Sequence, residues 1–427
     1  MAIQTEKSAQ LSSEAAGMIP GGVNSPVRHY DPYPFFASKS DGSHIWDVDG
    51  NQFIDLCNGY GSMLLGHKHN DIIQAVAAQM QKGTLYCVPT QLETTLSNLI
   101  ADNYDSIEMV RMVNTGGEAT MTAVRLARGH TEKNKILSFE GGYHGAHDSV
   151  LVKAGSGSAT LPASGGVLLQ TTKQTLVAKY NDVEGFAEAA ESSDDIAAVI
   201  MEPVMANMGL ILPDRKFLDA VRHITRQRGM VLIFDEVVTG FRVSDGGAQK
   251  YFGVTPDITT LAKALGNGFG VAAVGGNKKI MEMLAPLGDV YQASTFAGNP
   301  IAATAAISSI RAMRRMGRTI YDTLGKYCAR VSSAIDDAAT DHKIPHRVHH
   351  ISSMFQVFFT EHDVYDYATA KRSDTARFQR LFKLLLERGI FVPPSQFETA
   401  FLSGAMTDDD INDIISAYAE SVAVLAK

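Results

Sequence analysis

Two charged residues stand where apolar segments of this chain end. Asp235 closes the run Val-Leu-Ile-Phe-Asp at residues 231–235, and Lys263 follows the run Ile-Thr-Thr-Leu-Ala at residues 258–262. They are 28 positions apart (263 − 235). A lysine can form a Schiff base with a cofactor aldehyde, and a carboxylate can keep a pyridinium nitrogen protonated. The pair therefore predicts pyridoxal phosphate (PLP) chemistry, with Lys263 and Asp235 as catalytic residues.

Further residues could complete such a site. Gly116 and Gly117 open a predicted helix, whose free backbone N–H groups could bind a phosphate, although an ordinary helix start has the same pattern. Tyr143 follows a glycine pair after a predicted strand, where it could stack on a planar ring or pack in the core. The hydroxyl of Thr295 suits phosphate oxygens. Arg28 could bind a substrate carboxylate with two hydrogen bonds, or be a solvated surface residue.

Two other patterns indicate neither a dinucleotide site nor a metal site. The glycines at residues 266–270 resemble part of a dinucleotide fingerprint, but they lack the βαβ start and the ribose-binding acid at the expected distance that this motif requires. The histidines at 144 and 147, and those at 346, 349 and 350, have no cysteine or carboxylate at metal-ligand spacing. We predict no metal.

Composition narrows the class of protein. The 427 residues are 45% hydrophobic and 20% charged, which is typical of a globular chain of two or three domains. No basic run favours nucleic acid, and no apolar stretch is long enough to cross a membrane. Three widely spaced cysteines indicate neither a disulfide framework nor a zinc site, and the N-terminus has no signal-peptide pattern. We expect a cytoplasmic protein.

The order of elements predicts the fold. Residues 43–55 read as a hairpin with a two-residue turn at Asp49 and Gly50. Apolar strands at 135–140, 196–202 and 231–237 then alternate with helices, of which 214–228 is the best marked, and this alternation indicates a mainly parallel α/β sheet. The stretch 153–180 reads as a long functional loop or lid. We predict domain segments at 1–60, 61–310 and 311–427, the last being a smaller α+β domain.

Several stretches together resemble one family. They are residues 21–28 (Gly-Gly-Val-Asn-Ser-Pro-Val-Arg), 45–55, 106–111, 152–157 (Val-Lys-Ala-Gly-Ser-Gly), 235–242, 253–257 and 394–398 (Pro-Ser-Gln-Phe-Glu). The chain resembles the class III aminotransferases of PLP fold type I, and within them the glutamate-1-semialdehyde 2,1-aminomutase family. The resemblance implies a large domain with a seven-stranded sheet, a small domain built from both chain ends, and a homodimer.

The resemblance also implies roles for single residues. Lys263 would hold the cofactor and shuttle protons, Asp235 would bind the pyridinium, Val237 would pack against the ring and Tyr143 would stack on it. The further cofactor contacts would be Gly116, Gly117, His144, Asn207 and, from the second subunit, Thr295. The substrate contacts would be Arg28, Ser156 and Glu398. The chain departs from the family pattern at Gly117, Tyr60, Gly270 and Met406.

The implied activity is amine transfer within one molecule, with the cofactor as PLP or pyridoxamine phosphate (PMP). It would make 5-aminolevulinate for tetrapyrrole (porphyrin) biosynthesis from an amino-aldehyde substrate, which an upstream reductase could hand over in a transient contact. One alternative is an aminotransferase that uses separate amine donors and acceptors. Two others are a catalytically silent protein of this fold and a purely structural α/β protein. The intact Lys263 and Asp235 speak against the last two.

Overall fold

The computed structural model describes residues 3–154 and 160–426, and the chain divides into two compact units. The large unit comprises Asn70–Tyr321 and Tyr365–Ala368, and the terminal unit comprises Met1–His69, Asp322–Val364 and Thr369–Lys427. Across the described part of the chain, no helix is both long and apolar enough to cross a membrane.

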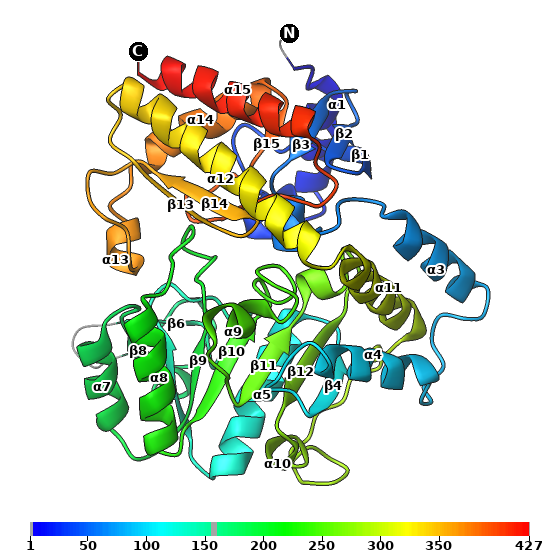
Figure 1. The fold of residues 1–427 in the computed structure, drawn as a ribbon, viewed down its shortest axis with the longest axis vertical. Helices are drawn as coiled ribbons and strands as arrows, with labels where there is room; N and C mark the ends of the chain where they lie inside the picture. Colours follow the sequence, from blue (N-terminus) through cyan, green and yellow to red (C-terminus); the bar gives the residue numbers. More distant parts are fainter. Residues whose placement is uncertain (1–2, 155–159, 427) are drawn as a thin grey trace. The chain divides into compact units, whose positions relative to one another are not determined.

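A seven-stranded sheet forms the centre of the large unit (Figure 1). Its strand order is β4-β12-β11-β10-β9-β5-β8. The pairs from β11 to β8 are parallel, and only β12 runs antiparallel to its two neighbours. The prediction of a mainly parallel seven-stranded sheet is thus confirmed. The strands are β4 Met109–Val113, β5 Lys135–Phe139, β8 Thr175–Ala178, β9 Ile196–Met201, β10 Val231–Glu236, β11 Ile258–Leu261 and β12 Ala272–Gly276.

Helices bury the central strands of this sheet. Every residue of β9, β10 and β11 is buried, which explains why these strands read as continuous apolar runs without alternation. The helix α5 packs along β9, β10, β11 and β12. The predicted helix at 214–228 is α8, which starts where the Asp214 carboxylate accepts the Lys216 N–H and ends before Gly229 at φ 62°.

The other elements of the large unit flank the sheet. They are α3 Asn70–Met80, α4 Gln91–Ala101, α5 Gly116–Thr131, β6 Val152–Ala154, β7 Thr160–Pro162, α6 Leu169–Thr172, α7 Val183–Glu191, α8 Arg215–Gln227, α9 Gly247–Phe252, η3 Lys263–Leu265, α10 Lys278–Met281 and α11 Pro300–Met316.

The stretch 153–180 differs from its prediction as one long loop. It contains β7, α6 and β8, and β8 is an edge strand of the seven-stranded sheet. The strand is only four residues long and lies among serines, threonines and glycines, so its apolar signal is too short to stand out.

The terminal unit joins both ends of the chain in one sheet. The strand β15 pairs in parallel with β3, in a sheet of order β1-β2-β3-β15, and a second sheet has the order β13-β14-β16. The elements are α1 Glu6–Ala16, η1 Pro20–Gly22, η2 Pro26–Arg28, β1 Ala37–Asp41, β2 His44–Asp47, β3 Gln52–Asp55, α2 Asn58–Gly61, α12 Arg318–Asp341, β13 Arg347–Ile351, β14 Met354–Phe358, α13 Tyr367–Ala370, α14 Thr375–Glu387, β15 Ile390–Phe391, β16 Ala400–Phe401 and α15 Asp408–Leu425, of which α12 and α13 span unit boundaries.

The predicted hairpin exists, but its turn is longer than two residues. The strands β2 and β3 pair antiparallel and are joined by residues 48–51. The carboxylate of Asp47 accepts the backbone N–H groups of Asp49 and Asn51, at 3.0 and 2.8 Å, and so holds the wider turn.

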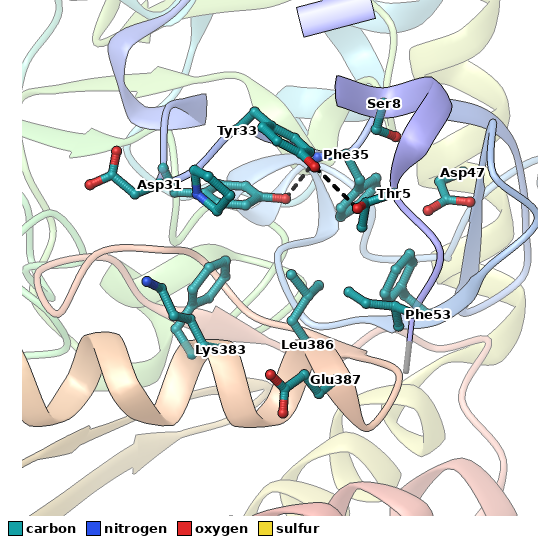
Figure 2. A pocket seen from close by; sticks show the side chains of 14 residues that line it. Thr5, Ser8, Asp31, Tyr33, Phe35, Asp47, Phe53, Lys383, Leu386 and Glu387 are labelled. Atoms are coloured by element: carbon teal, nitrogen blue, oxygen red, sulfur yellow. Dashed lines mark hydrogen bonds between the residues drawn. The ribbon is translucent and has the colours of Figure 1, made fainter. Parts of the chain in front are cut away.

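An aromatic cavity of about 190 Å³ lies inside the terminal unit (Figure 2). Phe35 stacks on Phe53, and Tyr30 meets Phe382 edge to face. The Tyr30 hydroxyl accepts the Phe35 N–H, and burial raises the pKa of Tyr30 to about 12. These rings pack the segment 30–35 against α14. The segment follows η2 and Arg28 in the sequence. None of the predicted site residues lines the cavity.

Candidate active site

Asp235 is a buried carboxylate at the end of β10, with 4% of its surface exposed. One of its oxygens lies 2.7 Å from His144 Nδ1. The other accepts the Val237 N–H at 3.1 Å and the Thr260 hydroxyl at 3.3 Å. Buried charges require partners of this kind, because an isolated one costs several kcal/mol. Its surroundings therefore suit a carboxylate that faces a positive group.

Lys263 stands just beyond the end of the neighbouring strand. In the parallel pair β10–β11, Asp235 lies opposite Thr260, so Lys263 lies past the same carboxyl edge of the sheet, where ligands bind in open α/β sheets. Lys263 is half-buried and has φ 46°, in the left-handed region that side chains rarely adopt. Residues held there cluster at functional sites.

The start of α5 lies beside these strand ends. Gly116 is pressed against Val237: a Cβ on Gly116 would lie 2.9 Å from both Val237 methyl carbons. Val237 packs in turn with Ala262, next to Lys263. Gly117 in turn lies close to Gly145: a Cβ on Gly145 would lie 2.6 Å from the Cα of Gly117. Only glycines allow these approaches, and they leave the first N–H groups of α5 uncovered by side chains.

The segment that carries Thr295 touches the same helix start. Asn114 donates to the Ser294 hydroxyl at 2.6 Å and to Glu118 at 3.0 Å. Thr295 itself is exposed, and so is Phe296 beside it. An exposed Thr295 is compatible with the predicted contact to a second subunit, which stays a prediction.

Tyr143 and Asn207 lie on two loops joined by a carboxylate that the sequence reading missed. Glu202, the residue after β9, accepts the Tyr143 N–H at 2.9 Å and the Asn207 side-chain amide at 2.9 Å. The Tyr143 side chain is 53% exposed, so its ring is available for stacking. Glu202 closes a buried apolar strand just as Asp235 does, and that shared pattern was the signal that could have found it.

His144 is buried beside Asp235, and His147 is a half-buried neighbour on the same loop. His144 contacts Asp235 through Nδ1, whereas a direct contact with the cofactor was predicted; this contact is untested. His147 Nε2 lies 3.4 Å from the Thr120 hydroxyl, which also donates to the His144 carbonyl. Burial, followed by the neighbouring charges of His144 and Arg128, lowers the pKa of His147 from 6.5 to about 4. His147 is therefore neutral at physiological pH.

The predicted substrate contacts lie in another part of the chain. Arg28 and Glu398 belong to the terminal unit, and the charges of both act on Tyr60 of the same unit. The Tyr60 hydroxyl donates to the Val27 carbonyl at 2.5 Å. Burial above all, then Cys57 and the charge of Glu398, hold the pKa of Tyr60 well above its usual range, whereas Arg28 lowers it. Ser156 lies outside the described residues.

The large-unit residues fit pyridoxal phosphate. They offer a partnered carboxylate for a ring nitrogen, a lysine at the next strand end, and a helix start at which Gly116 has no room for a side chain. Within the residues that the structure describes, no group of three or more His, Cys, Asp or Glu side chains could hold a metal ion.

The chain resembles known proteins over nearly its whole length. The family model of class III aminotransferases matches residues 26–417. A glutamate-1-semialdehyde 2,1-aminomutase of Nitrosopumilus maritimus is 56% identical and covers 96% of this chain and 97% of its own length. An omega-transaminase of Sphaerobacter thermophilus superposes with a TM-score of 0.93 at 30% identity, covering 98% of both chains. A transaminase solved with PLP bound gives a TM-score of 0.92 at 29% identity, covering 100% and 99%.

Proposed function

Because the chain belongs to the class III aminotransferases, and within them to the glutamate-1-semialdehyde 2,1-aminomutases, we propose that it converts glutamate-1-semialdehyde to 5-aminolevulinate. The two compounds are isomers, so one amino group moves and no external donor is consumed. The observation that carries this proposal is the 56% identity to the aminomutase of Nitrosopumilus maritimus over nearly the full length of both chains. The product would enter porphyrin biosynthesis.

The cofactor, as PLP or PMP, supplies an electron sink and a carrier for the amino group. The residues of the chain have the remaining tasks. Asp235 keeps the ring nitrogen protonated, and its contact with His144 supports a carboxylate in that role. The Lys263 amine would hold the cofactor covalently and, once released as a free amine, would move a proton between the cofactor carbon and the substrate carbon that flank the transferred nitrogen. The N–H groups of Gly116 and Gly117 bind the phosphate.

The remaining site residues orient the reacting molecules. The ring of Tyr143 and the side chains of Val237 and Asn207 fix the plane of the cofactor. Arg28 binds the substrate carboxylate, with Ser156 and Glu398 as further substrate contacts. The residues of the predicted lid that precede β8 would exclude water, so that the diamine formed between the two halves of the reaction stays bound.

The proposed assembly is a homodimer in which Thr295 binds the phosphate of the partner subunit. Large apolar side chains flank Thr295: Tyr291 is 70% exposed and Phe296 is 60% exposed. Such a patch on one chain favours burial against a second copy. We further propose a transient contact with the reductase that makes the aldehyde, and a cytoplasmic location.

The alternative is an aminotransferase with separate donor and acceptor, which the high structural similarity to the omega-transaminase favours. The purified protein should be incubated under anaerobic conditions with glutamate-1-semialdehyde, once alone and once with an amine donor. The aminomutase forms 5-aminolevulinate equally in both. A requirement for the donor, with release of a keto co-product, would instead establish the aminotransferase. Lys263→Ala is the inactive control.

A further inference from the structure

Glu202 joins two segments of the cofactor site through one buried carboxylate. Its Oε1 accepts the Tyr143 N–H at 2.9 Å. Its Oε2 accepts the Ala206 N–H at 3.0 Å and the Asn207 side-chain amide at 2.9 Å. Glu202 is 3% exposed and directly follows the last residue of β9, the strand next to β10. One side chain thereby sets the distance between the loop after β5 and the turn after β9.

The partners of Glu202 require an ionised carboxylate. All three are donors, and a protonated carboxyl would have to direct its own proton at one of them. The pKa of Glu202 is raised, mainly by burial and further by Asp235, whereas His144 and the N–H groups of Tyr143 and Ala206 lower it. His144 thus acts electrostatically on Glu202 and also contacts Asp235, near the ends of β9 and β10.

We propose that Glu202 is a positioning residue of the cofactor site: its carboxylate fixes the two loops that carry Tyr143 and Asn207, beside the Asp235–His144 pair. The inference rests on the proposed function for the identity of the ring that these residues face. It adds a residue that touches no cofactor atom and acts through two that would.

Glu202→Gln tests the proposal because glutamine has a single acceptor oxygen. Whichever way its amide points, at least one N–H donor faces the new NH₂ group. Glu236→Gln is the matched control. Glu236 is also fully buried, lies on β10 beside Asp235, and accepts the N–H groups of Ala248 and Gln249. It therefore reproduces the loss of a buried charge without touching the two loops.

The first readout is backbone hydrogen exchange of the purified chain. Glu202→Gln should speed exchange in residues 141–145 and 204–208, and Glu236→Gln should speed it around residues 246–250 instead. Exchange at wild-type rates in the first two segments of Glu202→Gln, or the same pattern in both variants, would overturn the proposal. This readout needs no cofactor.

The second readout is the bound cofactor. With Glu202→Gln, the dissociation constant of PLP should rise roughly tenfold, the scale of one lost hydrogen bond to a charged group, and the visible circular dichroism of bound PLP should change. Glu202→Asp, which keeps the charge, should recover part of both. Glu236→Gln should leave both unchanged; a change as large as that of Glu202→Gln would contradict the proposal. A wild-type chain that binds no PLP would refute the proposed function and leave the exchange result to decide on Glu202.

Discussion

Asp235 shows how a single buried carboxylate is surrounded by hydrogen-bond donors inside this chain. Three donors of the large unit surround it, namely His144, Val237 and Thr260. An amide in its place would keep the size of the side chain but lose the charge. The role of Asp235 thus depends on electrostatics rather than on shape.

Asp235→Asn should therefore retain cofactor but lose turnover, because an amide cannot hold the ring nitrogen in its protonated form. We expect kcat to fall roughly 100-fold or more, a typical scale for losing a charge at a reacting centre. Steady-state kinetics with saturating PLP would measure it. The exposed Asp219, which pairs with Arg215, offers Asp219→Asn as the neutral control. Near-normal turnover of Asp235→Asn would contradict the assigned role.

Arg28→Ala should act on substrate binding instead. The loss of a two-hydrogen-bond contact with a carboxylate raises KM. It lowers kcat/KM by a factor that corresponds to about 2–4 kcal/mol of lost transition-state stabilisation. Arg28→Lys should restore only part, since a single ammonium cannot reproduce the paired geometry. Arg330→Ala is the control, because Arg330 is an arginine of the same unit that pairs with Asp408. An unchanged KM for Arg28→Ala would remove Arg28 from the substrate site.

At the scale of elements, the loop after β5 carries two histidines, His144 and His147, that are largely shielded from water. Burial favours the neutral His147 ring, because it lowers the pKa of His147 from 6.5 to about 4. Above pH 6.5 the ring is neutral in both the folded and the unfolded chain. As the pH falls from 6.5 toward 4, the unfolded chain binds the proton first, so the folded state loses stability.

His147→Gln should remove this part of the acid sensitivity. Between about pH 7.5 and about pH 5, the wild type should lose about 2 kcal/mol more unfolding free energy than the variant. Urea titrations at the two pH values measure the difference. His362→Gln serves as control, because His362 lies in an exposed turn of the terminal unit. Equal losses in wild type and His147→Gln would show that His147 is not protected from protonation.

Regular elements were predictable from the sequence, and contacts between loops were not. Burial on both faces makes β9 and β10 continuous apolar runs, and an N-cap and a glycine mark α8. The strand β8 was missed because its four residues lie in a polar stretch. The Lys263–Asp235 pair was recognisable because both residues end strands. The links from Glu202 to Tyr143 and Asn207 depend on tertiary approach, which no local pattern encodes.

At the scale of the whole molecule, the proposed site needs a second copy of the chain. Sedimentation equilibrium should give a homodimer of this 46.1 kDa chain. Phe296→Glu should weaken the dimer and PLP binding together, since a charge would be buried next to Thr295. Leu168→Glu, which changes a different exposed apolar residue of the large unit, should do neither. A monomer with full activity would refute the shared site.

The central claim is that the amino group moves within one molecule of substrate, and counting turnovers without a donor tests it most directly. Protein freed of amino acids and loaded with PMP should be given a large excess of glutamate-1-semialdehyde under anaerobic conditions. We predict that 5-aminolevulinate accumulates to many equivalents per active site, with no keto co-product. Formation that stops at or below one equivalent, and resumes only when an amine donor is added, would contradict the claim.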